Sequence, residues 1–405
     1  MVNVSTASTQ LPDTCEALVC TAPQRAEVRR VPVPRELGDG GLGRVLAAGV
    51  CGSDLSLFRG GAIAERLWPL VLGHETVVQV EASSQVLTER WGVRAGDRVF
   101  VEEFIPCGWC QVCRSGNYRV CPRTDFRSEW FVRYGRTSLD TAHGLWGGFA
   151  EYLYLHPNAR LHPVPDNVDA HLAVLATPIA NGLRWVRTVA DTQPGDHVVV
   201  LGPGAHGLGC VAAAREVGAR EMIVVGRSSD SHRLVVGTAL GASAVLQSDH
   251  DDVLAEVFRR TDGRGAAVVI DATGSTQAAS LAPRLAAHAG RVVFAGGTTA
   301  AADGFPVDLI TSRELRILGV RGHDGHDIAR ALNLIESGRF DFSLMSGRST
   351  ALNEGAALLT ALCAEEAIDH APHHVLVPGH ATGLPVRDPE LLDRLNGGGP
   401  DEGAR

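Results

Sequence analysis

The sequence of 405 residues contains no lysine, so all 37 of its basic residues are arginine. Without a lysine amine, Schiff-base chemistry, attachment of pyridoxal phosphate and P-loop phosphate binding are excluded. Hydride-transfer sites built on a tyrosine and a lysine are excluded as well. Because the bias runs through the whole chain, a GC-rich genome explains it and no single site requires it.

The chain also lacks long apolar runs and an excess of positive charge. No stretch approaches the roughly 20 apolar residues of a membrane span. The first residues, MVNVSTASTQLPDT, lack the basic n-region and the apolar h-region of a signal peptide. The net charge of -9 argues against a nucleic-acid partner, because phosphate binding requires a basic face. Nine cysteines, clustered like metal ligands, fit a reducing compartment. We expect a cytoplasmic protein without a membrane or nucleic-acid partner.

The pattern of apolar segments predicts two kinds of domain. Through 14–178, short runs rich in Val, Gly and Pro, such as VLGHETVVQVE, predict an irregular, barrel-like β domain. Through 179–322, apolar strands such as HVVVLG and EMIVVG alternate with helical stretches such as STQAASLAPRLAAHA, which predicts an α/β doubly wound parallel sheet. The polar ends, 1–13 and 379–405, are expected to be flexible.

Four cysteines share the run CGWCQVCRSGNYRVC, with the spacing C-x2-C-x2-C-x7-C; they are Cys107, Cys110, Cys113 and Cys121. Four thiolates this close together suit a closed, tetrahedral structural zinc. Core packing of the thiols does not explain so regular a spacing beside polar residues. An iron–sulfur cluster is the alternative, but the bacterial ferredoxin spacing has three residues before the last cysteine, where this run has seven.

A glycine-rich run, G-P-G-A-H-G, follows the apolar strand HVVVLG and begins a helix of small residues. In this context Gly202, Gly204 and Gly207, with His206 among them, predict a dinucleotide site whose pyrophosphate meets the helix N-terminus. A turn without a ligand is the alternative.

The end of the next strand bears on the choice of nucleotide. An NAD site would carry an acidic side chain there, but this chain has Gly226 followed by Arg227. An arginine can meet a ribose phosphate, so NADP is favoured over NAD. Arg227 as a solvated turn residue, and Asp230 as a partner of the ribose hydroxyl, remain alternatives.

A second group of metal-binding residue types, CGSD at Cys51 and GHE at His74, is spread over 25 positions and suits an open, catalytic zinc. With the four-cysteine run, GDRV at 96–99, GGFAEY at 147–152 and the glycine fingerprint, the chain resembles the medium-chain dehydrogenase/reductase superfamily over about 14–378. The resemblance is to its zinc-containing alcohol, polyol and threonine dehydrogenase branch.

The resemblance implies a GroES-like β-barrel catalytic domain, 14–178 and 323–378, interrupted by a Rossmann NAD(P)-binding domain, 179–322. The active site would lie in the cleft between them. A homodimer or homotetramer is expected by analogy, because the four-cysteine lobe of such proteins often lies near subunit contacts.

The resemblance also assigns residues to the catalytic zinc. Cys51 and His74 match ligands, and Glu75 matches an acidic residue that stands beside the metal and can itself coordinate. Zinc lowers the pKa of an alcohol, and Ser53 can accept the hydroxyl proton. Asp54 matches a carboxylate that orients the imidazole of His74. The plain alternatives are a turn hydroxyl for Ser53 and a helix cap for Asp54.

Thr177 departs from the family pattern. Relatives carry Cys, Asp or Glu as a further ligand before the proline that is Pro178 here, and a neutral hydroxyl is a poor zinc ligand. We expect Cys51, His74, Glu75 and water to hold a weakened catalytic zinc, with Thr177 facing the substrate or a bound water. Loss of this metal, with the structural site kept, is the competing hypothesis.

Two further segments bear on the chemistry. Ser56 stands where many relatives have a histidine in the proton path, so Ser53→Ala is expected to cost more activity than Ser56→Ala. The segment RTDFRSEWFVRYGRTSLDTAHGLW joins arginines to aromatic residues. It can border the substrate and recognise an anionic or polyhydroxylated molecule, or lie at a surface or subunit contact.

The expected activity is zinc-dependent, NAD(P)-linked hydride transfer between a secondary alcohol, such as a polyol or cyclitol, and its ketone. A zinc-independent, NADPH-dependent reductase of C=C or C=O bonds is the first alternative. A nucleotide-binding protein with a degenerate catalytic site is the second, because Thr177 can mark such a site.

Overall fold

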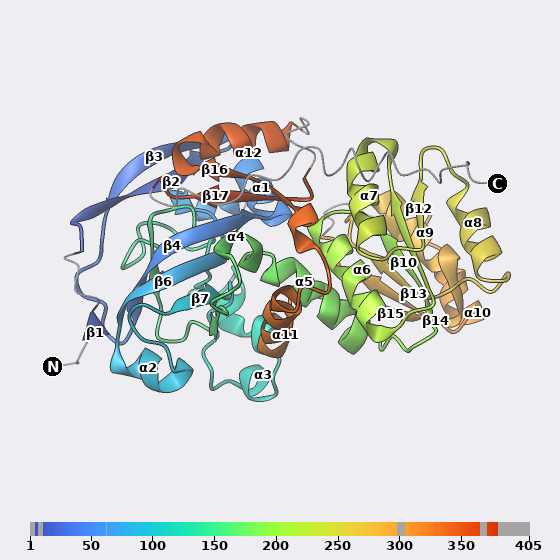
Figure 1. Ribbon diagram of the computed structural model, residues 1–405, viewed down its shortest axis with the longest axis horizontal. Helices are drawn as coiled ribbons and strands as arrows, with labels where there is room; N and C mark the ends of the chain where they lie inside the picture. Colours follow the sequence, from blue (N-terminus) through green and yellow to red (C-terminus); the bar gives the residue numbers. More distant parts are fainter. Residues whose placement is uncertain (1–4, 7–10, 62, 298–303, 365–370, 380–405) are drawn as a thin grey trace, which may run out of the picture.

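The computed structural model describes residues 5–6, 11–61, 63–297, 304–364 and 371–379. Figure 1 shows two sheet-based units side by side, with α5 (Ala176–Leu183) and α11 (Gly325–Glu336) between them. Most of the terminal segments 1–13 and 379–405, which we expected to be flexible, lie outside the described residues.

The first unit is built on a large, mostly antiparallel sheet with the strand order β16-β17-β4-β6-β7-β9. Its strands are β4 (Gly41–Val50), β6 (Glu75–Ser83), β7 (Arg98–Val101), β9 (Leu161–Pro163), β16 (Ser346–Ala351) and β17 (His373–Val377), with β1 (Ser5–Thr6) paired to β6 and β8 (Tyr152–Leu155) to β4. β17 pairs antiparallel with β4, so the C-terminal part of the chain returns to the sheet that the N-terminal part begins. The red strands among the blue ones in Figure 1 show this return.

A smaller sheet and short helices surround the large one. The smaller sheet has the order β3-β2-β5, with β2 (Thr14–Ala22), β3 (Arg25–Pro32) and β5 (Leu70–Val71). The helices of this unit are α1 (Gly52–Arg59), α2 (Gln85–Trp91), α3 (Gln111–Arg114), α4 (Ala170–Ala173) and α12 (Gly355–Cys363), with short 3-10 turns η1 (Ala64–Arg66), η2 (Tyr118–Val120), η3 (Pro122–Thr124), η6 (Phe342–Met345) and η7 (Leu352–Glu354). Apolar side chains on the inner faces of both sheets form one core.

The second unit is a six-stranded parallel sheet with the order β12-β11-β10-β13-β14-β15. Its strands are β10 (His197–Leu201), β11 (Glu221–Gly226), β12 (Ala244–Gln247), β13 (Ala266–Asp271), β14 (Ala286–Phe294) and β15 (Arg316–Gly319). Its helices are α6 (Ala205–Val217), α7 (Ser231–Ala239), α8 (Val253–Arg260), α9 (Thr276–Leu285) and α10 (Val307–Ser312), with the 3-10 turn η5 (Ser228–Asp230). This is the doubly wound sheet that the alternating pattern predicts.

The strand order of this sheet reverses between β10 and β13. In doubly wound sheets, ligands bind beyond the carboxyl ends of the strands at such a point. The glycine fingerprint connects β10 to α6, so it lies where the topology favours a nucleotide.

One helix expected from the sequence ends early. The stretch STQAASLAPRLAAHA predicts a helix to about residue 289, but α9 ends at Leu285 and β14 begins at Ala286. Ala286 pairs with Ala266 of β13, so strand pairing takes residues whose local preference is helical.

Glycines bring α5 and α6 into backbone contact at the junction of the two units. A Cβ on Gly182 would lie 2.2 Å from the carbonyl carbon of Gly209, and one on Gly209 would lie 2.3 Å from the Pro178 oxygen. No larger residue fits at either position without a backbone shift. This contact fixes the first turns of α6, and hence the glycine fingerprint, against the helix that carries Thr177.

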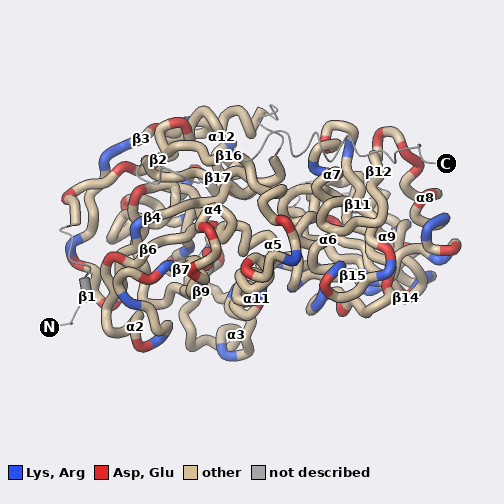
Figure 2. The backbone as a smooth tube through the Cα atoms, viewed as in Figure 1, with Lys and Arg blue, Asp and Glu red and all other residues tan. Residues whose placement is uncertain are grey.

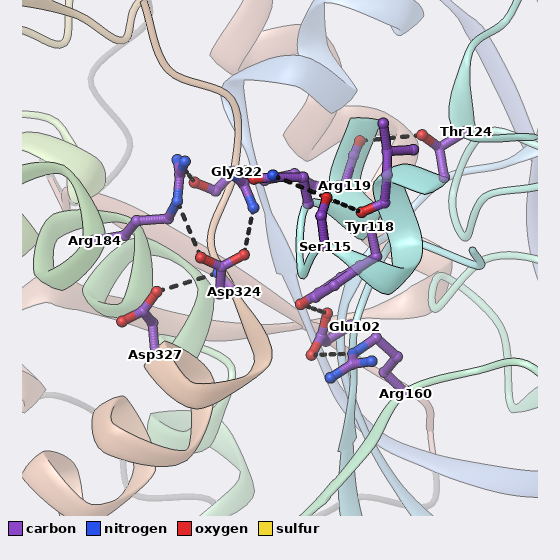
Figure 3. A network of polar contacts seen from close by, with 12 residues as sticks. Glu102, Ser115, Tyr118, Arg119, Thr124, Arg160, Arg184, Gly322, Asp324 and Asp327 are labelled. Carbon is purple, nitrogen blue, oxygen red and sulfur yellow. Dashed lines mark hydrogen bonds and ion pairs between the residues drawn. The ribbon is translucent and has the colours of Figure 1, made fainter. Parts of the chain in front are cut away.

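Ion pairs link the four-cysteine lobe, residues 107–121, to the same junction (Figure 3). Arg119 of the lobe pairs with Asp324, which caps α11. Arg184, at the start of the π-helical turn η4 (Arg184–Val189), also contacts Asp324 at 3.4 Å and donates to the Gly322 oxygen at 3.1 Å. The lobe therefore contacts the segment through which the chain returns to the first unit.

Glu102 is the buried centre of a second part of this network (Figure 3). It accepts from Tyr118 of the lobe at 2.7 Å and contacts His162 at 2.6 Å and Arg160 at 3.2 Å. Burial opposes ionisation of Glu102, but His162 and Arg160 outweigh it and lower the pKa of the carboxyl from 4.5 to about 2.

The distribution of charged residues and the length of the helices bear on the expectations from composition. Figure 2 shows arginine and acidic segments interleaved along the backbone of both units. Among the described residues, none of the helices combines the length and the apolarity that a membrane span requires.

Candidate metal and nucleotide site

Asp54 joins the two loops of the first unit that carry the expected catalytic zinc ligands. Cys51 is the N-cap of α1, and Asp54, in the first turn of that helix, accepts from the Cys51 backbone N–H at 3.0 Å. The same carboxylate, fully buried, accepts from the Gly73 backbone N–H at 3.3 Å. The helix cap that we weighed as an alternative is therefore present, and it also fixes the loop before His74.

His74 is held by the same carboxylate. Its Nδ1 lies 3.0 Å from Asp54 Oδ1, and its Nε2 lies 3.4 Å from Ser53 Oγ. Burial opposes protonation of the imidazole, but the carboxylate of Asp54 outweighs it and raises the pKa of His74 well above its ordinary value. Donation from Nδ1 to Asp54 leaves Nε2 as the atom that can bind a metal.

Glu75, the first residue of β6, is buried and meets a histidine from the far end of the chain. Glu75 Oε2 lies 2.7 Å from Nε2 of His373 in β17. A Cβ on Gly49 would lie 2.6 Å from that oxygen and 2.5 Å from the His373 ring, so only glycine leaves room for the pair. Sequence reasoning missed His373, because nothing near it in the chain indicates a partner 298 residues away.

Three metal-binding side chains converge from both units. One donor atom each of Cys51, Glu75 and His206 lies within 4.8 Å of the others. His206 is the second residue of α6, inside the glycine fingerprint, and its ring stacks on Trp185 with centroids 5.5 Å apart. His74 is not part of this threefold set.

Thr177 lies on α5 with 5% of its surface exposed. It therefore belongs to the buried part of the junction between the two units. Its neutral hydroxyl adds no strong donor to a zinc site.

The four cysteines of the lobe form a compact cluster. The sulfur of Cys110 lies 3.4 Å from that of Cys113 and 3.9 Å from that of Cys121, and the sulfurs of Cys107 and Cys113 are 3.8 Å apart. A tetrahedron with zinc–sulfur bonds of about 2.3 Å has sulfur atoms about 3.8 Å apart. The thiols therefore fit a structural zinc ion without rearrangement.

The donor set of the second cluster also fits zinc. Thiolate, imidazole and carboxylate are the three ligand types that zinc prefers. Cys51, Glu75 and His206 supply them at a partly buried position between the two units, and His74 lies beside Cys51 and Ser53.

The glycines of the fingerprint have separate structural roles. Gly202 has φ +98, which favours glycine, and a Cβ on Gly207 would lie 1.9 Å from the Gly202 oxygen. A Cβ on Gly204 would meet no atom within 4 Å, so the backbone there is open to an approaching ligand. This division matches a tight turn, a close approach to pyrophosphate and a tightly packed helix.

The end of β11 presents an exposed arginine. Arg227 follows Gly226, and its backbone N–H donates to Asp230 at 3.0 Å. A Cβ on Gly226 would approach Pro203 of the fingerprint to 2.9 Å. Asp230 also contacts Arg233 at 3.5 Å, so the acidic group that we considered for a ribose hydroxyl already has two partners.

A cavity of about 380 Å³ adjoins the metal donors in the first unit. Ser53, the hydrogen-bond neighbour of His74, and Ser56 both line it. The arginine-rich segment contributes its other wall, through Phe126, Phe131, Arg133 and Arg136. The segment therefore borders a cavity, and its place beside the substrate stays a prediction.

Comparison with known proteins identifies both units. Residues 42–166 match the model of the alcohol dehydrogenase GroES-like domain, and residues 205–337 match that of the zinc-binding dehydrogenase family. A protein of Mycobacterium tuberculosis assigned as an alcohol dehydrogenase is 40% identical over 367 residues, which cover 89% of this chain and 98% of that one. The erythritol/L-threitol dehydrogenase of Mycolicibacterium smegmatis is 30% identical over 82% of this chain and 89% of its own.

Solved structures agree. The alcohol dehydrogenase of Thermus sp. ATN1 superimposes with a TM-score of 0.77 and 27% identity, over 90% of this chain and 99% of that one. A Sinorhizobium meliloti protein assigned to the zinc-binding dehydrogenases, solved bound to NADP, gives a TM-score of 0.77 and 25% identity over 91% and 100%. The chain is an oxidoreductase that belongs to the zinc-type medium-chain dehydrogenase/reductase superfamily.

Proposed function

We propose that the protein is a zinc-dependent, NAD(P)-linked oxidoreductase that transfers hydride between a small secondary alcohol and its ketone. The observation that carries the proposal is the convergence of three sites. Metal donors Cys51 and Glu75 lie within 4.8 Å of His206 in the nucleotide fingerprint, and the cavity beside them is lined by Ser53. The cavity is linked to the metal donors through Ser53, whose hydroxyl oxygen lies 3.4 Å from His74 Nε2.

The chain's own residues divide the work of the proposed reaction. A bound zinc would supply a Lewis acid that lowers the pKa of the alcohol. Ser53 lines the cavity, so its hydroxyl is positioned to accept a hydrogen bond from the alcohol and to start a proton relay, in which it passes its own proton to water as it takes that of the alcohol. Asp54 orients His74 and holds the Cys51 loop, and thereby keeps two donors in place.

Arg136 supports a substrate with a polyol character or an anionic group. Arg133 and Arg136 both line the cavity, but Arg133 is paired with Glu103 and covers the Phe104 ring at 4.5 Å. In the part of the chain that the structure describes, Arg136 has no ion pair, and its buried Nε has no hydrogen-bond partner. A half-buried, unpaired guanidinium favours an anionic or hydroxyl-rich ligand.

Relatives support the same substrate class. One is an erythritol/L-threitol dehydrogenase, and another is the D-arabitol-phosphate dehydrogenase of Enterococcus avium, 29% identical over 80% of this chain. We propose NADP as the favoured nucleotide, because Arg227 stands exposed at the end of β11 where a ribose phosphate would lie.

Turnover of a panel of secondary alcohols, polyols and polyol phosphates tests the activity. Each is assayed with NADP and NAD, before and after chelation and after return of zinc. Loss of turnover on chelation and recovery with zinc is the expected result. Undiminished reduction of C=C or C=O bonds by NADPH after chelation would support the zinc-independent reductase. Nucleotide binding without any turnover would support a nucleotide-binding protein with a degenerate catalytic site.

Arg136→Gln tests the substrate class. The KM for a polyol phosphate should rise about tenfold, since a charge-assisted hydrogen bond contributes roughly 1.5 to 3 kcal/mol, while the KM for the neutral polyol changes little. Arg127→Gln is the matched control, because Arg127 is exposed and paired with Asp125. Equal changes for the charged and neutral substrates would count against recognition by Arg136.

A further inference from the structure

The sequence places His206 in the nucleotide fingerprint, but its imidazole lies beside the metal donors of the other unit. A donor atom of His206 is within 4.8 Å of donor atoms of both Cys51 and Glu75. The ring is held from one side by its stack on Trp185, with centroids 5.5 Å apart and an interplanar angle of 21°. The glycine contact between α5 and α6 fixes the helix turn that carries it.

We propose that His206 is a protein ligand of the metal, contributed by the nucleotide-binding loop. The proposal rests on the zinc dependence proposed above. Thr177 supplies no thiolate or carboxylate where relatives have a ligand. Among the described residues of the first unit, the donors near the site are Cys51, His74 and Glu75, because the carboxylate of Glu103, 4.0 Å from His74, is already paired with Arg133. A neutral imidazole at the edge of this set supplies the missing strong donor.

Glu75 keeps the site compatible with substrate. Catalytic zinc sites keep one coordination position open, whereas four fixed protein ligands would close it. Of the four donors, Glu75 has an alternative partner, since its Oε2 lies 2.7 Å from His373 Nε2. Cys51, His74 and His206 would then be the lasting ligands, and Glu75 would be the donor that gives way.

A ligand from α6 has a consequence that ligands from the first unit lack. Cys51, His74 and Glu75 belong to the first unit, while His206 follows the glycines that approach the pyrophosphate. A metal held by all of them would tie the two units together. Zinc affinity therefore depends on the seating of the nucleotide-binding loop as well as on the first unit.

Zinc affinity and cobalt spectroscopy of the nucleotide-free, full-length protein test the proposal. In His206→Ala, the affinity of the second site for zinc should fall at least about tenfold, so that less chelator removes the metal. Loss of a group that merely orients a ligand already lowers metal affinity by about this factor. Zinc in the four-cysteine lobe should stay, which also reports that the variant is folded. His250→Ala is the matched control, an exposed histidine of the same unit.

His206→Cys gives a readout that a structural role for His206 would not produce. The spectrum of cobalt in the second site is obtained by subtracting the spectrum of Cys51→Ser. In this difference spectrum, the new thiolate should add a sulfur-to-cobalt charge-transfer band. His206→Ala should lose intensity or shift the visible bands of the same difference spectrum. His250→Ala should match the wild type.

Three outcomes are distinguishable. Weakened zinc and altered cobalt spectra in the His206 variants alone support the proposal. Two zinc ions per chain with unchanged affinity and spectra in both variants would overturn it and leave the proposed function standing. A single zinc per chain in the wild type, held by the four-cysteine lobe, would overturn both.

Discussion

The two candidate metal clusters of this protein differ in how the fold supplies their donor side chains. The lobe takes all four cysteines from fifteen consecutive residues, 107–121. Three of their sulfur–sulfur distances are 3.4 to 3.9 Å, and all four sulfur atoms lie within 4.8 Å of one another. In the second cluster, Cys51 caps a helix, His74 and Glu75 lie at the start of β6, and His206 comes from the other unit. A local site needs little beyond its own loop, whereas the dispersed site depends on the packing of the whole molecule.

Replacing one cysteine in each cluster should separate their roles, with the largest effect at the second. Cys51→Ser should lower kcat/KM about a thousandfold, because zinc contributes several kcal/mol of transition-state stabilisation, and should leave the lobe zinc bound. Cys107→Ser should instead release the lobe zinc and lower the unfolding temperature. Zinc content, activity and thermal unfolding of both variants check this. Loss of stability without loss of activity in Cys51→Ser would reverse the assignment.

The network behind the lobe gives the next largest effect. Glu102→Gln should lower the free energy of unfolding at neutral pH by about 3 kcal/mol, since it removes the buried carboxylate to which Arg160, His162 and Tyr118 are hydrogen-bonded. The pKa of Glu102 is lowered in the folded protein, from 4.5 to about 2. Its stabilisation is therefore complete above pH 4.5 and is lost as the pH falls toward 2.

Denaturant unfolding of wild type and variant across this pH range measures the effect. The difference between them should shrink steadily below pH 4.5. Glu89→Gln, at an exposed residue of α2, is the control and should change stability little. A difference that stays constant down to pH 2 would show that Glu102 does not titrate as its partners require.

Two serines of the cavity sharpen the account of the second cluster. Both Ser53 and Ser56 line the cavity, but only Ser53 has its hydroxyl at 3.4 Å from His74. Ser53→Ala should lower kcat about a hundredfold, the low end of what a positioned proton acceptor contributes, while Ser56→Ala should change it little. Steady-state rates against pH measure both. Equal losses would remove Ser53 from the proton path.

The smallest effect concerns the nucleotide. Arg227→Ala should raise the KM for NADP about tenfold and change that for NAD little, because only NADP offers a phosphate to the guanidinium. Arg220→Ala, an arginine of the same unit before β11, is the control. The ratio of kcat/KM values for the two nucleotides is the measurement. A wild type that prefers NAD would contradict a role for Arg227.

What the sequence can predict follows the same contrast between local and dispersed features. The parallel sheet is predictable because each strand is an apolar run between helical stretches, and the lobe because its spacing alone fits a tetrahedral metal. The early end of α9 is not predictable from local sequence, because Ala286 belongs to β14 and pairs with Ala266 of β13.

The dispersed contacts of the site are also beyond local patterns. His206 was placed in the nucleotide fingerprint, and its approach to Cys51 and Glu75 depends on how the two units pack. His373 of β17 reaches Glu75 of β6 because both strands lie next to β4 in the sheet. In the sequence β17 lies far from the other two strands. Side chains that meet through tertiary packing leave no periodicity or spacing in the sequence.

The zinc content of the purified, nucleotide-free wild-type protein tests the central claim most directly. The donors of the second cluster fit zinc despite Thr177, so elemental analysis should find about two zinc ions per chain. In Cys51→Ser the content should fall to about one. A wild-type content of about one zinc per chain, unchanged in Cys51→Ser, would contradict the account.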